Sequence, residues 1–367
     1  MDHLPDDVLL MAMQYLDVPD LLACRIVCKR LGDLALHPDV WRRRRLSHTD
    51  PWVCPALRLA PCLGEVHLKL PAAGRHSLYT ATRCAVAALR LTALVVRGQE
   101  ALGRLKRLHL DLGFYGRLDP SVSVLLATVA SSAGLQTLVV PVAPHCAAFI
   151  ASLHVSTASA HASSLQHFRC GLGRHLEPFI NCMLTVHTST LRVVELVNPD
   201  FIAPRSAATA PLLAGVTNLC KLECGLVPGL QAALACGSLS EVTLWVRGEM
   251  PDYVADAKMF LRGAHQLRAL QYRDVVNAPA NVGLSLVLAL TGQPDRSQLA
   301  SLVVDNDGDF EDSQLEPLYE ALPSLPALRH IEMNGEVYVR GHAKPHYPRE
   351  GAVPADSQAA ASHGAAP

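Results

Sequence analysis

The chain has 367 residues, of which 50% are hydrophobic but only 5% aromatic, so its core has to be built from Leu, Val and Ala. A formal net charge of −1 gives no bulk attraction to nucleic acid or to an anionic membrane, and we expect neither as a partner. The N-terminus has no basic segment, and no stretch of about 18 apolar residues occurs, so we expect neither a signal peptide nor a membrane span. Eleven cysteines without a Cys-x-x-Cys pair predict reduced thiols in the cytoplasm, with the nucleus as the alternative.

Residues 1–45 have the pattern of three short amphipathic helices. Pro5 fits the first turn of a helix, and the two aspartates after it favour the positive helix N-terminus. Apolar positions continue to a break at residues 17–20, a second helix follows, and a third stretch ends near Trp41. A unit of this size buries too little surface to be strongly stable alone. We therefore expect it to dock on a partner through apolar residues that its own core leaves uncovered.

This segment resembles an F-box in the order and spacing of its residues. The resemblance is carried by Leu4, Pro5, Asp7, Leu9, Tyr15, Leu16, Asp20, Leu21, Leu22, Arg25, Val27, Cys28, Lys29, Arg30 and Trp41. It departs from many F-boxes at Leu31, where tryptophan is common. The resemblance implies binding to the adaptor subunit of a cullin–RING ubiquitin ligase through interlocking helices. It assigns that contact, or its support, to Leu4, Pro5, Val8, Leu9, Leu16, Leu21, Leu22, Ile26 and Val27. The alternative is a three-helix cap on the repeats that follow.

A strand pattern, Leu-x-x-Φ-x-Φ with Φ apolar, recurs along the rest of the chain. It begins at Leu105, Leu135, Leu165, Leu191, Leu219, Leu239, Leu267, Leu299 and Leu328. These eight intervals cover 223 positions, an average of about 28 residues, which is typical of leucine-rich repeats. Helical stripes lie between the strands, over residues 122–129, 146–153, 176–183 and 315–322. We therefore expect an α/β fold, in which a three-helix F-box precedes a leucine-rich-repeat solenoid with concave parallel strands and convex helices.

The repeat spacing is irregular in two places. Leu63 and Leu91 also begin the strand pattern, but only 14 residues separate Leu91 from Leu105, so one segment here is expected to be irregular. The interval after Leu219 is 20 residues and leaves room for only a brief helix around residues 230–234. The predicted division is an F-box at residues 1–45, a junction at 46–62, the solenoid at 63–340 and a disordered tail at 341–367.

No motif of an enzyme or of a cofactor site occurs in the chain, so we expect no catalytic residue, cofactor or metal. The strongest candidate is the acidic segment 305–316, which imitates a calcium loop but has Phe310 where that loop needs glycine. We interpret it as a strand-to-helix loop. The basic run at residues 42–45 is interpreted as a solvated helix end, and its alternative is a phosphate-binding or nuclear-import patch. The cysteine pairs Cys24/Cys28 and Cys220/Cys224 are interpreted as packing residues.

The concave face of the predicted solenoid is the expected recognition surface. Side chains between the core positions of each strand point to that face. The predicted partner-binding residues are Arg107, His109, Asp111, Glu241, Thr243, Trp245, Arg247, Gln271 and Arg273. The same face is expected to carry Lys221, Glu223, His330, Glu332 and Asn334. We predict Trp245 beside Arg247 as the hot spot, and the alternative is a tryptophan that covers a neighbouring strand for packing alone.

Together these patterns predict a substrate-recognition subunit of an SCF-type ubiquitin ligase. The resemblance implies that the N-terminal segment binds the ligase adaptor and, through it, the cullin complex. The repeats would hold a protein substrate so that its lysines lie near the ubiquitin-loaded enzyme. Two alternatives remain: an interaction scaffold without a role in ubiquitination, and a metal-dependent hydrolase that uses residues 305–316. The sequence identifies no particular substrate.

Overall fold

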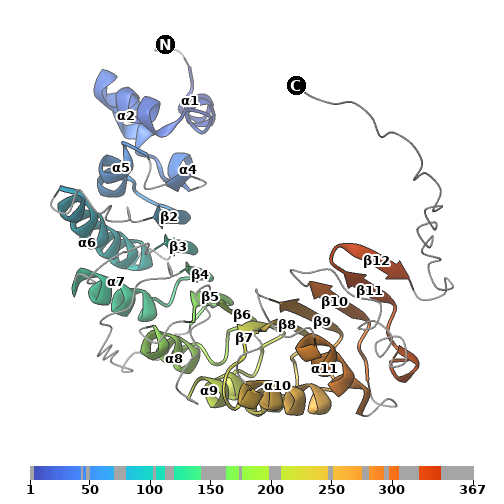
Figure 1. Ribbon diagram of the computed structural model, residues 1–367. Helices are drawn as coiled ribbons and strands as arrows, with labels where there is room; N and C mark the ends of the chain where they lie inside the picture. The colour runs from blue at the N-terminus through green and yellow to red at the C-terminus, as the bar shows by residue number, and fades with distance from the viewer. Residues whose placement is uncertain are drawn as a thin grey trace, which may run out of the picture.

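The computed structural model describes residues 4–42, 44–46, 50–69, 80–101, 105–111, 120–141, 163–172, 176–197, 208–246, 251–274, 281–292, 297–305 and 322–339. These residues build a curved sheet with helices along its outer side and a small helical group at its N-terminal end (Figure 1). The arrangement agrees with the predicted α/β class. Within the described ranges, no helix is both long enough and apolar enough to span a membrane.

The N-terminal group has four helical segments where three helices were predicted. They are α1 (Asp6–Met13), α2 (Val18–Val27), α3 (Lys29–Ala35) and α4 (Pro38–Trp41). The predicted break at residues 17–20 is wrong, because α2 already begins at Val18. The Asp17 carboxylate accepts a hydrogen bond from the Asp20 N–H at 3.0 Å and so caps the helix. Pro19 lies in the first turn of α2, where its missing N–H costs nothing.

The part of the chain that the structure describes contains one sheet of twelve strands in chain order. They are β1 (Arg45–Leu46), β2 (Glu65–Lys69), β3 (Arg107–Asp111), β4 (Thr137–Val140), β5 (His167–Gly171), β6 (Val193–Val197), β7 (Lys221–Gly225), β8 (Glu241–Val246), β9 (Ala269–Asp274), β10 (Ser301–Asp305), β11 (His330–Met333) and β12 (Glu336–Val339). All neighbouring pairs from β1 to β11 are parallel. β12 returns antiparallel to β11 after a turn in which Asn334 and Gly335 both have positive φ. Asn334, predicted on the concave face, therefore belongs to this hairpin turn.

A ladder of apolar side chains explains why the strands stack in this register. The structure has a strand at each of the nine predicted positions, and another follows Leu63. One core residue of each strand pairs with the same position of the next. This ladder runs through Val66, Leu108, Leu138, Phe168, Val194, Leu222, Val242, Leu270, Leu302 and Ile331. Every member is buried, so each strand covers the apolar side of its neighbours.

Helices cover the outer side of the sheet (Figure 1). They are α5 (Val53–Leu59), α6 (Thr80–Ala101), α7 (Pro120–Ala130), α8 (Glu177–Val186), α9 (Thr209–Gly215), α10 (Pro251–Gly263) and α11 (Asn281–Ala289), with short 3-10 helices η1 (Leu230–Ala235), η2 (Leu290–Gly292) and η4 (Leu322–Ser324). The stripes at residues 122–129 and 176–183 are confirmed as α7 and α8, and η1 confirms the predicted brief helix. The stripes at residues 146–153 and 315–322 lie almost wholly outside the described residues.

The expected irregular segment is the one from Leu91, which fits the strand template but belongs to helix α6. Leu89, Ala93 and Val96 are buried at helical spacing, whereas Leu94, a core position of the strand pattern, is 64% exposed. The sheet also begins earlier than residue 63. β1 lies across the predicted boundary between F-box and junction and pairs with β2, and α5 occupies the middle of the predicted junction.

Candidate functional site

Exposed apolar side chains are concentrated at the N-terminal end of the molecule. Among the described residues, eleven large hydrophobic side chains are exposed, and six of these belong to residues 4–27. We call these six the N-terminal apolar surface: Leu4, Val8, Met11, Tyr15, Ile26 and Val27. Tyr15 is 88% exposed and Ile26 is 84% exposed. A soluble chain rarely leaves so many apolar groups together unless a partner covers them.

Val8 and Met11 lie on one side of α1, and Leu4 and Tyr15 flank the helix at its two ends. Leu4, Val8, Met11 and Tyr15 follow one another at intervals of four, three and four residues, and the spacing of Val8 and Met11 is the repeat of one helix face. Met13, which projects from another side of the helix, is 3% exposed and joins the core. α1 therefore has one apolar face that packs inward and another that remains open.

The residues predicted to bind the adaptor divide into three groups. Leu4, Pro5, Val8, Ile26 and Val27 are exposed, whereas Leu9, Leu16 and Leu22 are half-buried. Leu21 is only 1% exposed, so it supports the surface from below and is not itself available for contact. Met11 and Tyr15 were missing from the predicted set. Their spacing from Leu4 and Val8 was the signal that would have added them.

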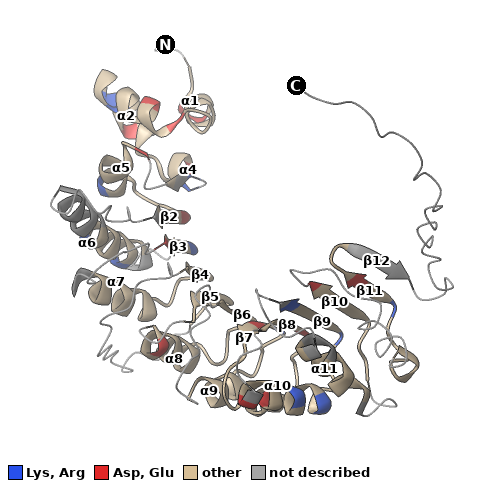
Figure 2. Cartoon of the chain, viewed as in Figure 1, with Lys and Arg blue, Asp and Glu red and all other residues tan. Residues whose placement is uncertain are grey.

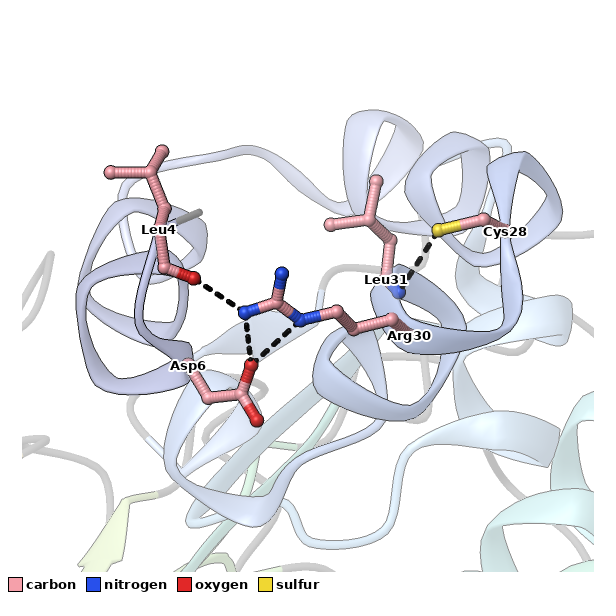
Figure 3. Close-up of polar contacts among 5 residues, drawn as sticks. All are labelled: Leu4, Asp6, Cys28, Arg30 and Leu31. Atoms are coloured by element: carbon pink, nitrogen blue, oxygen red, sulfur yellow. Dashed lines mark hydrogen bonds and ion pairs between the residues drawn. The ribbon is translucent and has the colours of Figure 1, made fainter. Parts of the chain in front are cut away.

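A polar contact joins the two parts of the N-terminal apolar surface (Figure 3). The Arg30 guanidinium, near the start of α3, donates to the Asp6 carboxylate at 2.8 Å from Nε and at 2.6 Å from Nη2. Its Nη2 also donates to the backbone carbonyl of Leu4. Arg30 follows Val27 by three residues, so the contact holds the beginning of α1 against the corner between α2 and α3.

Comparison with known families gives a match at this same end of the chain. The F-box-like family matches residues 1–47. Residues 1–47 form an F-box-like domain. F-box domains bind the adaptor subunit of cullin–RING ubiquitin ligases. No curated protein matches the chain at a significant level.

Arg44 joins two helix ends of the F-box-like domain. Its guanidinium donates to the carbonyls of Met13 and Val40, both at 2.8 Å, and so links the ends of α1 and α4 immediately before β1. Burial lowers the pKa of Arg44, and the Asp17 carboxylate opposes this shift. Arg44 also borders a pocket of about 710 Å³. Within the basic run, Arg42 is exposed, as the interpretation as a solvated helix end expects, whereas Arg44 is half-buried and bonded to helix-end carbonyls.

A tryptophan makes a second contact of this kind within the F-box-like domain. Trp41 is completely buried, and its indole N–H donates to the Ala35 carbonyl at 2.7 Å. Beyond it, the backbone of the F-box-like domain approaches the sheet so closely that a Cβ at Gly64 would lie 2.5 Å from the Arg42 carbonyl oxygen. The position therefore requires glycine, and the F-box-like domain is packed directly on the sheet.

The inner face of the sheet, on the side away from the helices, is polar. In its N-terminal part, the rings of His67 and His109 lie with centroids 4.0 Å apart, and Arg107 lies 3.4 Å from the Glu65 carboxylate. Burial lowers the pKa of His109, and the neighbouring His67 lowers it further. His109 is therefore biased toward its neutral form, which lets the two rings lie against each other without repulsion.

Glu195 is the centre of a second polar group, on β5 and β6. It lies 3.1 Å from His167 and 3.4 Å from Arg169. The hydrogen bond from His167 is the main cause that lowers the pKa of Glu195, and the charges of His167 and Arg169 act in the same direction. Burial acts against them. Glu195 was absent from the predicted set although it occupies an inner-face position of its strand.

A third group connects four strands, and we call it the Trp245 cluster: Glu223, Thr243, Trp245, Gln271, Arg273 and Asp305. The Trp245 indole N–H donates to Glu223 at 2.9 Å, and the Arg273 guanidinium lies 5.0 Å from the centre of the Trp245 ring. Arg273 in turn lies 3.3 Å from Asp305, which also accepts from Gln271 at 3.0 Å. Gly225 is the register partner of Trp245 on β7 and presents no side chain that would crowd the indole.

The predicted partner-binding residues can now be placed. Arg107 and Glu241 are exposed, whereas His109, Asp111, Trp245, Gln271 and Arg273 are half-buried. Thr243 is only 5% exposed, and its hydroxyl donates a hydrogen bond to the Gln271 side-chain carbonyl at 3.4 Å. Arg247 lies outside the described residues, and the cation beside Trp245 is Arg273. Trp245 contacts the neighbouring strand through Glu223 and is half-buried, and its role as a hot spot stays a prediction.

Acidic residues outnumber Lys and Arg at the inner-face positions of β6–β11, and Figure 2 colours the charged residues along the chain. On β6–β11 the described inner-face positions hold five carboxylates, two Lys or Arg side chains and one histidine, His330. The carboxylates belong to Glu195, Glu223, Glu241, Asp305 and Glu332, and the Lys and Arg side chains are those of Lys221 and Arg273. Among the described residues, no three His, Cys, Asp or Glu side chains gather closely enough to hold a metal ion. The calcium-like segment after Asp305 lies outside the described residues.

Proposed function

We propose that the chain is a substrate-recognition subunit of an SCF-type ubiquitin ligase and not itself an enzyme. The observation that carries the proposal is the N-terminal apolar surface, which lies on a domain whose family binds the ligase adaptor. Each large apolar side chain that becomes fully covered contributes about 1.5–3 kcal/mol. A few of these six residues are therefore enough for a stable contact with the adaptor, after the cost of association is subtracted.

We further infer that the body of the chain is a leucine-rich-repeat solenoid. The leading leucine of every predicted unit supports this assignment, because Leu105, Leu135, Leu165, Leu191, Leu219, Leu239, Leu267, Leu299 and Leu328 are all buried. The continuous parallel sheet and the helices on its outer side support it as well. Each unit then covers its neighbours, as the stacking of repeats requires.

On this proposal the inner face holds the protein substrate. The Trp245 cluster is its best candidate hot spot, because a tryptophan and an arginine are held in fixed positions and remain partly open. The acidic excess on β6–β11 favours a substrate segment with basic side chains, since complementary charge speeds encounter and fixes register. Adaptor and substrate would then occupy separate ends of one rigid molecule.

The test is co-purification of the full chain with the ligase adaptor. Val8→Asp and Ile26→Asp place a charge in the N-terminal apolar surface at exposed positions, so the chain should stay folded while adaptor recovery falls by at least about tenfold. Met259→Asp, at a position that is 47% exposed on α10, is the matched control and should bind the adaptor normally. Equal recovery of the adaptor by all three variants would refute the assigned surface.

A second measurement, made in the cells from which the full chain is purified, distinguishes the ligase subunit from an interaction scaffold. Proteins recovered with the full chain, apart from the subunits of the ligase, are candidate substrates. Their abundance should rise when the proteasome is inhibited, and Ile26→Asp should cause the same rise without inhibition. If the wild-type chain carries no adaptor and its partners do not accumulate, the chain is an interaction scaffold.

A further inference from the structure

Helix α1 has no capping side chain of its own. Its N-cap position is Pro5, which forms no side-chain hydrogen bond to the first turn. An uncapped helix start frays readily. Here Arg30 reaches back from α3, 24 residues away from Asp6 along the chain, and binds both that first-turn carboxylate and the Leu4 carbonyl (Figure 3). A residue from another helix thus fixes the beginning of α1.

The geometry at the end of α2 makes this reach possible. Cys28 has an extended backbone with φ −157° and ψ 163°, which ends α2 and turns the chain into α3. Its thiol accepts a hydrogen bond from the Leu31 N–H at 3.5 Å (Figure 3). Arg30 is therefore held on a short, capped corner directly after Val27, and its side chain is directed toward α1.

The contact adds little to the stability of the free chain. In the ion pair, the Arg30 side chain is 38% exposed and the Asp6 side chain is 61% exposed, and pairs this open to water are strongly screened. Its effect is instead to connect Leu4 and Val8 on one side with Ile26 and Val27 on the other. Only a guanidinium provides two donor groups in a fixed fork for a carboxylate and a carbonyl at once.

We propose that Arg30 is a positioning residue for the adaptor contact, which orders the Leu4 end of α1 before the adaptor arrives. This inference rests on the proposed function, because the surface that Arg30 orders is the one assigned to the adaptor. Ordering a segment in advance removes that cost from the binding step. Arg30 acts through Leu4 and Asp6 and does not itself have to touch the adaptor.

The test measures the dissociation constant of the purified full chain for the purified adaptor subunit. Arg30→Met should weaken binding about tenfold, the equivalent of one lost charge-assisted contact. Asp6→Asn should weaken it less, and Arg30→Lys should fall between Arg30→Met and the wild type. Hydrogen exchange of the amides of residues 6–9 should become faster in free Arg30→Met. Arg97→Met, on α6, is the matched control and should change neither quantity.

A double-mutant cycle separates positioning from a general structural role. If Arg30 acts by ordering Leu4, then Leu4→Ala together with Arg30→Met should bind no more weakly than Leu4→Ala alone. Additive losses, or a lower melting temperature of Arg30→Met, would overturn the positioning role. Wild-type affinity in Arg30→Met, while Ile26→Asp fails to bind, would also overturn it and leave the proposed function intact. Failure of the wild-type chain to bind the adaptor would refute the proposed function itself.

Discussion

The N-terminal apolar surface and the Trp245 cluster are two recognition surfaces of opposite construction. The first presents six exposed hydrophobic side chains, and one ion pair holds its two parts together. In the second, the described polar groups already bond to one another, from Glu223 through Trp245 and Arg273 to Asp305. The first surface leaves apolar groups exposed, whereas in the second the polar groups contact one another, and of these Arg273 Nε is buried without a hydrogen bond.

This difference suggests a division of tasks. Apolar contact is strong but carries little directional information, so it suits one constant partner such as an adaptor. A preformed polar network accepts only a partner whose groups match its geometry and charge, so it suits selection among substrates. On our proposal the molecule uses each kind of surface for the task that its chemistry serves best.

The largest expected effect on the free energy of unfolding comes from truncating a buried residue of α2, and truncation of an exposed residue of the same helix is the comparison. Leu21→Ala removes a side chain that is 1% exposed and should lower the free energy of unfolding of the F-box-like domain by about 3 kcal/mol. Ile26→Ala removes one that is 84% exposed and should change that free energy by less than about 0.5 kcal/mol, while it weakens adaptor binding. Hydrogen exchange in α1–α3 measures the first quantity. Equal effects of both substitutions would show that Ile26 is part of the core.

Much of the sheet was predictable from the sequence, because the spacing of the apolar residues in each strand matches the positions that become buried. Each Leu-x-x-Φ-x-Φ pattern places apolar groups at positions that parallel stacking buries, so strands from β3 to β11 appear where they were expected. The same rule failed at Leu91, because α6 supplies buried residues at a helical spacing that overlaps the strand template. The local pattern allowed both structures, and packing against the sheet decided between them.

The candidate surfaces were less predictable than the fold. The family resemblance supplied Leu4, Val8, Ile26 and Val27, but it could not reveal that Leu21 is buried or that Tyr15 is exposed. On the inner face, alternation indicated which side chains share a side. It could not predict that Trp245 bonds Glu223, since that contact depends on the space left by Gly225 on a neighbouring strand.

The second prediction concerns the loss of stability at low pH. His187 is 2% exposed, its Nδ1 lies against the Ser163 hydroxyl, and burial lowers its pKa to about 4 from an ordinary value of 6.5. Below pH 6.5 His187 takes up a proton in the unfolded chain but not at its buried site after α8, so its contribution to stability is complete above that pH and is lost as the pH falls toward 4. The loss should reach about 3 kcal/mol.

Regional hydrogen exchange at pH 7 and pH 5 checks this expectation. Amides of β5, β6 and α8 should lose protection at the lower pH in the wild type. His187→Leu removes the titrating group and should make protection there less dependent on pH, whatever its own effect on stability. The same pH dependence in the His187→Leu variant would assign the loss to other groups.

The smallest expected effect tests whether the Trp245 cluster is a network or a set of independent neighbours. Trp245→Leu and Arg273→Met should show a coupling of about 0.5–1 kcal/mol in the free energy of unfolding, because each removes one side of the ring–guanidinium contact at 5.0 Å. Trp245→Leu combined with Arg107→Met, on a distant strand, is the matched cycle and should be additive. Additivity in both cycles would mean that Trp245 merely packs over β7. The Trp245 cluster would then not be a preorganised polar network, and the contrast with the N-terminal apolar surface would be lost.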